Sequence, residues 1–240
     1  MDCCYVTGAL PLAAPPAYPS TLPPLALFMP RVLVILAHPQ LEQSRVAAAL
    51  VAAALVAATA AAPPGTATQA NHITVRDLYT LYPDYLVDVA AEQAALAGVD
   101  LLVWLHPVHW YGMPPLMKLW LDEVFAFGWA YGPGGRALAG ADLWLVTSTG
   151  GPESAYHPSG HNRYFFDAFL PPYEQTAMLA GLRFLPPLVL HGAHKVADAH
   201  IAGHAQMFVD RLRCYPDWPE LDDLDAAVVC DVPADARPAD

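Results

Sequence analysis

Short apolar segments alternate with helical segments along most of this chain, and this alternation restricts its fold more than any other feature. Strands that read as continuous apolar runs are typical of a parallel sheet covered by helices on both faces. We therefore predict an α/β fold with a five-stranded parallel sheet. The expected strands are residues 31–37, 73–78, 100–105, 142–146 and 185–190, and the expected helices are 46–62, 92–96, 114–127, 164–182 (interrupted by Pro171-Pro172) and 198–213.

The two ends of the chain differ from its centre in composition. Residues 1–30 contain seven prolines and no Lys or Arg, which predicts a disordered extension and argues against a secretory signal. Met29 precedes the first expected strand, so we expect the natural start there. Residues 215–240 hold eight acids and one base, which predicts an acidic disordered tail. The folded domain is expected to span residues 31–214.

Charge and cysteine usage limit the environment and partners of the protein. The formal charge is −12, and the chain has no cluster of Lys or Arg, so we expect no nucleic-acid partner. The four cysteines have no metal-ligand spacing and indicate free thiols of a reducing cytoplasm. Ten histidines include three pairs at short spacing, at 106 and 109, 191 and 194, and 200 and 204, but no carboxylate or cysteine joins them, and we expect no metal.

The expected first helix, residues 46–62, is almost wholly apolar and invites comparison with a membrane span. Its seventeen residues reach only the lower end of the roughly 17–25 residues that a span needs. A buried helix with a face of small residues is the better prediction. Its larger side chains are expected to form one stripe: Val46, Leu50, Val51, Leu55 and Val56.

Three unusual loops follow the first, third and fourth expected strands, at residues 37–44, 106–115 and 147–161. In an open parallel sheet all these loops open on the same edge, and ligands bind at that edge where the strand order reverses. We therefore expect the three loops to form one binding site, although they lie far apart in the sequence.

The first two loops offer a phosphate site and flat rings. Ser44 lies at the expected start of the first helix, where free N–H groups favour a phosphate, and His38 adds a hydrogen bond or a positive charge. The alternative is that Ser44 only caps the helix. Trp110 and Tyr111 are placed to wall a planar ring, and the alternative is that they belong to the core.

The third loop combines small residues with two proton-donating side chains. Ser148, Thr149 and the Gly150-Gly151 pair offer N–H groups that suit the carbonyl edge of an isoalloxazine ring. Tyr156 and His161 follow them and are expected to donate protons to a second substrate or to orient it.

These motifs together resemble the NAD(P)H:quinone oxidoreductase family of flavodoxin-like flavoproteins. Within that family the chain is most similar to the ancillary oxidoreductases of glutathione-gated potassium efflux systems. The resemblance covers about residues 31–214. It rests on LAHP (36–39) with Ser44 six residues after the histidine, RDLYTLYPDYLVDVAAEQAAL (76–96), HPVHWYGMPPLMKLWLDEVFAFGWAYG (106–132) and TGGPESAY (149–156).

The resemblance implies a flavodoxin-like homodimer that binds FMN, with FAD as an alternative. It also implies two-electron, ping-pong transfer from NADH or NADPH to a quinone. Tyr156 and His161 match the residues that line the quinone pocket, and Ala47 stands where the subgroup has an Asn. The implied flavin contacts are His38, Ser44, Arg45, Val46, Ala47, Val108, His109, Trp110, Tyr111, Ser148, Thr149, Gly150 and Gly151.

Two other functions remain to be weighed against the reductase. The first is a regulatory subunit of a membrane potassium-efflux antiporter, held at the cytoplasmic side of the inner membrane, with incidental reductase activity. The second is a one-electron carrier of the flavodoxin type. The carrier is the weaker alternative, because it has no use for a second-substrate pocket with Tyr156 and His161.

Overall fold

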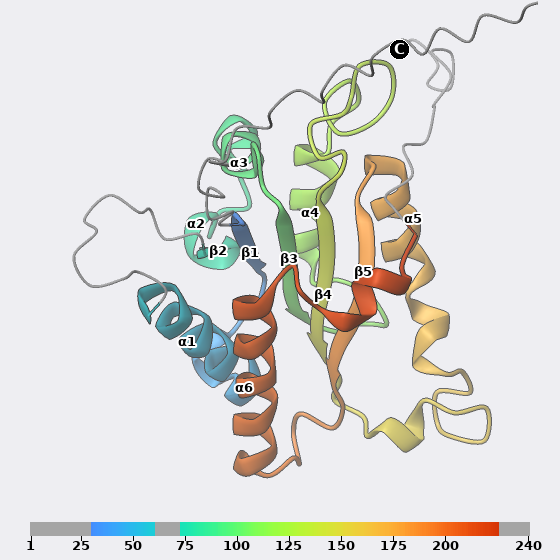
Figure 1. Cartoon of the computed structure of the whole chain (residues 1–240). Coiled ribbons are helices and arrows are strands. Elements are labelled where there is room, and N and C mark those ends of the chain that lie inside the picture. The colour runs from blue at the N-terminus through green and yellow to red at the C-terminus, as the bar shows by residue number, and fades with distance from the viewer. Residues whose placement is uncertain (1–29, 61–72, 226–240) are drawn as a thin grey trace, which may run out of the picture.

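The computed structural model describes residues 30–60 and 73–225, and five parallel strands form one sheet within them (Figure 1). The strand order is β2-β1-β3-β4-β5, which is the flavodoxin-like order, as predicted. The order reverses between β1 and β3, so the loops after these two strands meet at the switch point of the sheet. The strands are β1 (Val32–Leu36), β2 (Ile73–Asp77), β3 (Leu101–Pro107), β4 (Asp142–Ser148) and β5 (Arg183–Leu190).

Helices cover both faces of the sheet. Successive side chains of a strand point to opposite faces, so on β3 Trp104 packs into one apolar cluster and Val103 into the other. The cluster around Val103 includes α1 and α6, which lie together on one face in Figure 1. The helices are α1 (Arg45–Ala60), α2 (Leu78–Leu81), α3 (Val89–Leu96), α4 (Pro115–Val124), α5 (Pro171–Ala180) and α6 (Asp198–Cys214).

Helix α1 packs on the sheet through small residues, as predicted, but its buried stripe differs from the predicted one. Val46 and Leu50 are buried, and the stripe continues through alanines, including Ala54 and Ala57. Leu55 and Val56 are 52% and 61% exposed, so the prediction that they share the buried stripe is wrong. Alanines allow the helix to approach α6 and the sheet closely, and the larger residues then point away.

Prolines mark two further differences from the sequence-based expectations. Pro171 and Pro172 begin α5 and do not interrupt a longer helix, because proline fits the first helical positions, where no N–H donor is needed. Strand β5 includes Pro186 and Pro187 and is longer than expected. It lies at the edge of the sheet, where a missing N–H donor is tolerated.

The chain stays folded beyond residue 214, so the expected disordered tail from residue 215 is wrong for residues 215–225. Tyr215, Trp218 and Leu221 are buried against the α1 and α6 side of the core. Tyr215 donates a hydrogen bond of 2.8 Å to Asp142, and the Trp218 ring lies 4.8 Å from that of Trp144. Aromatic anchors within the acidic stretch explain why its charge does not keep it unfolded. Residues 226–240 lie outside the described part.

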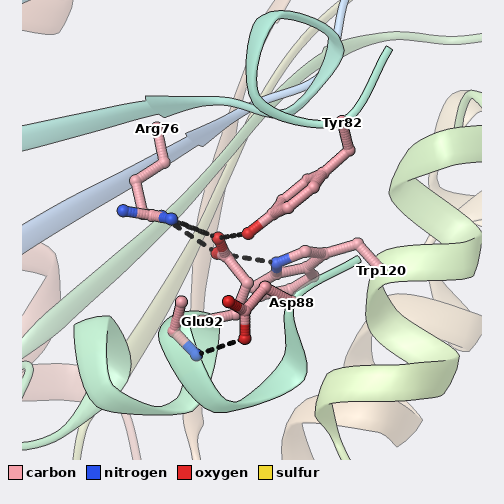
Figure 2. Close-up of polar contacts among 6 residues, drawn as sticks. Arg76, Tyr82, Asp88, Glu92 and Trp120 are labelled. Atoms are coloured by element: carbon pink, nitrogen blue, oxygen red, sulfur yellow. Dashed lines mark hydrogen bonds and ion pairs between the residues drawn. The ribbon is translucent and has the colours of Figure 1, made fainter. Parts of the chain in front are cut away.

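A buried carboxylate connects β2, α3 and α4 on the other face. Glu92 is fully buried and accepts hydrogen bonds from Arg76, from the Tyr82 hydroxyl and from Trp120 Nε1 (Figure 2). The Arg76 Nε atom lies 2.9 Å and 3.0 Å from the two carboxylate oxygens, and the indole nitrogen lies 2.9 Å away. Every oxygen of the buried charge is therefore satisfied, which a charge in a core requires.

Several expectations concern residues outside the described part of the chain. The expected extension at residues 1–30 falls almost wholly there, and so does Met29, the expected natural start. Within residues 30–60 and 73–225, no helix is long and apolar enough to cross a membrane. Cys214 is a free, exposed cysteine.

Candidate functional site

Two cavities lie at the carboxyl edge of the sheet, and Val108 lines both of them. The first measures about 510 Å³ and the second about 410 Å³. Of the predicted site residues, the first cavity is lined by His38, Ser44, Arg45, Val46, Val108, His109, Ser148, Thr149 and Gly150. The second is lined by Val108, Trp110, Tyr111, Gly151, Tyr156 and His161. Ala47 lines neither cavity and is buried.

The start of α1 forms one wall of the first cavity. The Ser44 hydroxyl accepts a hydrogen bond of 3.0 Å from the Ala47 amide, and its carbonyl accepts one of 3.2 Å from the Ala48 amide. Ser44 therefore caps the helix, as one of its two interpretations predicted. The capping leaves the amides of Arg45 and Val46 at the first turn for an anion, so the cap and a phosphate site are compatible.

The charge of the first cavity is positive or neutral. Arg45 is its one permanent cation, and no carboxylate is among the described residues that line it. The guanidinium donates a hydrogen bond of 3.0 Å to the Val196 carbonyl and forms an ion pair with Asp198. These contacts hold the guanidinium toward the start of α6, and Arg45 itself lines the cavity. Because both side chains of the ion pair are exposed, it adds little to stability.

His38 faces the first cavity as a neutral hydrogen-bond donor. The Gln40 amide donates to His38 Nδ1 over 3.1 Å, so the proton of the neutral ring is on Nε2. Partial burial and the nearby His109 lower the pKa of His38, and Asp77 raises it by a smaller amount. At neutral pH the ring is therefore uncharged, and the predicted hydrogen bond is favoured over the predicted positive charge.

Trp110 and Tyr111 lie at the tip of a strained turn beside the second cavity. His109 and Gly112 exchange two backbone hydrogen bonds of 3.0 Å, and the two aromatic residues between them have φ angles of 49° and 65°. Trp110 is 95% exposed, so the alternative that it belongs to the core is wrong. Tyr111 stacks on Phe169 at 5.0 Å. Non-glycine residues with positive φ cluster at ligand sites.

Tyr156 forms the inner wall of the second cavity, and His161 lies exposed at it. Tyr156 is 8% exposed, and burial raises the pKa of its phenol. The structure thus places Tyr156 and His161 at the same cavity. Asn162, which was not predicted, also lines this cavity and lies 3.4 Å from the Tyr111 hydroxyl.

A fourth loop, after β5, contributes to the site and was missed in the sequence. Ala193 and His194 line the first cavity, and His194 lies so close to Gly150 that a Cβ atom there would be 3.1 Å from Nε2. The spacing of His191 and His194 suggested only a metal pair. The better signal was their position after the fifth parallel strand, at the same edge as the other loops.

Solved structures with the same fold carry related descriptions. One, described as a thermophilic tryptophan halogenase from "Streptomycin violaceusniger", is 38% identical over 73% of this chain and 95% of its own, with a TM-score of 0.64. General stress protein 14 of Treponema denticola, solved in complex with FMN, is 34% identical over 77% and 99%, with a TM-score of 0.68. An NADPH-quinone reductase from P. pentosaceus is 25% identical over 77% and 96%, with a TM-score of 0.60.

The family comparison covers most of the described fold. A family model with the description "Flavodoxin-like fold" matches residues 30–212, which include all five strands and all but the last two residues of α6. The chain belongs to this flavodoxin-like family.

Proposed function

We propose that the protein is an FMN-dependent NAD(P)H:quinone oxidoreductase. The observation that carries this proposal is the pair of cavities that share Val108 as a lining residue, one suited to a phosphate and the other walled by aromatic rings. Relatives of 34% and 25% identity, described as an FMN complex and an NADPH-quinone reductase, support the same cofactor and reaction class.

The residues of the first cavity and the turn fit FMN. The phosphate would accept hydrogen bonds from the first amides of α1 and from the Ser44 hydroxyl, with Arg45 as counter-charge. The flat ring would lie against Trp110 and against the backbone of Gly150 and Gly151, which have no side chains of their own. Bound FMN supplies the transfer of two electrons from a nicotinamide to a quinone.

The chain's own part in the reaction is to orient the second substrate and to supply protons. The Tyr156 phenol is protonated at neutral pH, since its pKa lies above the ordinary value near 10 because of burial, and it can donate a hydrogen bond or a proton to a quinone oxygen. His161 can do the same from the exposed side of the cavity. The Tyr111 ring, which also lines this cavity, is held by stacking on Phe169.

The resemblance to ancillary oxidoreductases of potassium efflux supports a homodimer and a place beside a transporter. The segments at 76–96 and 106–132 carry that resemblance. Light scattering of the purified protein tests for the dimer. Co-purification with a co-expressed efflux transporter tests the regulatory function, and a monomer that does not co-purify contradicts both.

The experiment that tests the main proposal uses the purified full chain. We expect it to bind FMN with a visible flavin spectrum, to bind riboflavin more weakly because riboflavin lacks the phosphate, and to oxidise NADH or NADPH only when a naphthoquinone is present. A parallel assay supplies tryptophan, chloride and oxygen, since one relative is described as a halogenase. Chlorinated tryptophan without quinone reduction, or no flavin binding at all, contradicts the proposal.

A further inference from the structure

His191 lies behind the two cavities and has no role in the reductase as proposed above. It is the first residue after β5, is partly buried, and lines neither cavity. Its Nδ1 atom lies 3.0 Å from the Thr149 hydroxyl, which is on the loop after β4. Its position is therefore one from which it can act on the site only through its neighbours.

The direction of the hydrogen bond between these two side chains follows from their neighbours. The Thr149 hydroxyl also lies 2.8 Å from the Gly151 carbonyl, which can only accept. The hydroxyl has one proton and gives it to that carbonyl, so it must accept from His191 Nδ1–H. Thr149 is 1% exposed, and water cannot take the place of this donor. His191 therefore holds Thr149, and Thr149 holds the backbone of Gly151 at the second cavity.

The same imidazole packs against Tyr156. The two rings lie 5.3 Å apart at 46°, and the Phe166 ring lies 5.3 Å from His191 at 85°. Thr149 is a second link to Tyr156, because it holds Gly151, where an added Cβ atom would lie 3.8 Å from the Tyr156 ring. Both the ring contact and the hydrogen bonds thus connect His191 to the phenol that faces the second cavity.

We propose that His191 is a positioning residue for the second-substrate step, which orients Tyr156 through Thr149 and through direct ring packing. This inference rests on the proposed function. His191 touches neither the flavin cavity nor the quinone cavity, so its loss should alter the orientation of the phenol but not the binding of FMN or quinone. A positioning effect of this kind lowers kcat and leaves KM nearly unchanged.

Three variants separate the hydrogen bond through Thr149 from the ring contact between His191 and Tyr156. His191→Phe keeps a ring against Tyr156 and Phe166 but removes the Nδ1–H donor. His191→Asn removes the ring and keeps an N–H donor near the place of Nδ1. Thr149→Val removes the hydroxyl with little change in shape.

The measurement is stopped-flow kinetics of the FMN-loaded full chain, with flavin reduction by NADPH and quinone reduction followed separately. We expect His191→Phe to slow the quinone step about tenfold, at the lower end of acid–base effects, with flavin reduction and FMN affinity unchanged. His191→Asn should recover part of the loss. Thr149→Val should slow the quinone step as His191→Phe does, and because Thr149 also lines the first cavity, this variant is measured at saturating FMN. In a Tyr156→Phe background, His191→Phe should have no further effect, because the residue that it positions is already altered.

Two kinds of result overturn the inference: one leaves the proposed function intact, and the other overturns that function as well. If wild type reduces quinone and His191→Phe does so at the same rate, or if the loss is equally large in the Tyr156→Phe background, the inference alone is wrong. If wild type binds FMN and reduces no quinone, the proposed function is wrong and the inference falls with it. Should His191→Phe fail to fold, Thr149→Val and His191→Asn decide by the same comparison.

Discussion

Trp110 and Tyr111 are neighbours that both have positive φ angles, at 49° and 65°, within the turn closed by His109 and Gly112. A side chain in that region costs of order 1–3 kcal/mol, which glycine would avoid. Burial of the Trp110 ring does not offset this cost, because the ring is almost wholly exposed. The ring is therefore free to contact a ligand, and a flat ligand fits that position.

Trp110→Gly should separate flavin binding from folding. Relief of the positive φ should stabilise the flavin-free protein by up to about 1 kcal/mol. Loss of the stacking ring should weaken FMN binding about tenfold. Thermal unfolding without flavin and fluorescence titration with FMN measure the two effects. Trp144→Ala is the matched control at a buried indole, and it should lose about 3–5 kcal/mol of stability. A sharp fall in the stability of flavin-free Trp110→Gly would contradict this assignment.

Arg45→Gln should weaken FMN binding about tenfold through the loss of a charge-assisted hydrogen bond to the phosphate. Riboflavin binding should be unaffected, since riboflavin has no phosphate for Arg45 to contact. Titration of both ligands against both proteins measures the difference. Asp198→Asn is the control, because it removes the ion-pair partner and keeps the cation. Equal weakening of both ligands would place the phosphate elsewhere.

His106 should make the protein sensitive to acid. Its ring is buried and stacks on Tyr173 at 5.8 Å, and burial lowers its pKa to about 4. The unfolded chain binds a proton near pH 6.5 and the folded chain only near pH 4, so stability falls as the pH drops through this window. The loss from this group should reach about 3 kcal/mol at pH 4.

His106→Phe tests this pH dependence, because it keeps the stacked ring and removes the titrating group. Chemical denaturation between pH 7 and pH 4 should show a smaller loss of stability in the variant than in wild type. His200→Gln, at an exposed position of α6, controls for the removal of an imidazole. An unchanged acid profile in His106→Phe would show that other groups cause the loss.

Glu92→Ala should be among the most damaging single substitutions, because it leaves the half-buried Arg76 charge and the Tyr82 and Trp120 donors without their acceptor (Figure 2). We expect a loss of about 3–5 kcal/mol in the free energy of unfolding. Glu123→Ala, on the exposed side of α4, should change it by less than about 0.5 kcal/mol. Since Glu92 lines neither cavity, the folded fraction should bind FMN as wild type does. A small loss, or a selective loss of FMN, would contradict this view.

The sequence predicted the strands and the layers well, because buried parallel strands read as apolar runs and need no partner to be recognised. It predicted two features less well: which side chains of α1 are buried, and where the folded part of the chain ends. The buried stripe of α1 depends on how closely α6 approaches, and no periodicity within 46–62 distinguishes Leu55 from Ala54. The folded segment after Cys214 is acidic in composition, and its order depends on Tyr215 and Trp218 finding a place in the core.

The loops of the candidate site were predicted from topology and resemblance, but the relations among their side chains were not. That His38 is a neutral donor depends on the Gln40 amide, and that Trp110 is exposed depends on a backbone turn without a sequence signature. His191 and His194 were visible after the fifth strand. Their spacing drew attention to metal binding, whereas their contacts with Thr149 and Gly150 exist only in the folded chain.

The two prolines of β5 also limit how molecules of this protein can join one another. An edge strand with free N–H and C=O groups is a template on which a strand of another molecule can add, and repetition of that step leads to aggregates. Pro186 and Pro187 are consecutive, and backbone N–H groups alternate sides along a strand, so one of the two positions faces the free edge and lacks a donor there. A foreign strand that docks along β5 finds an interrupted row of donors, which disfavours sheet growth from one molecule to the next on this side.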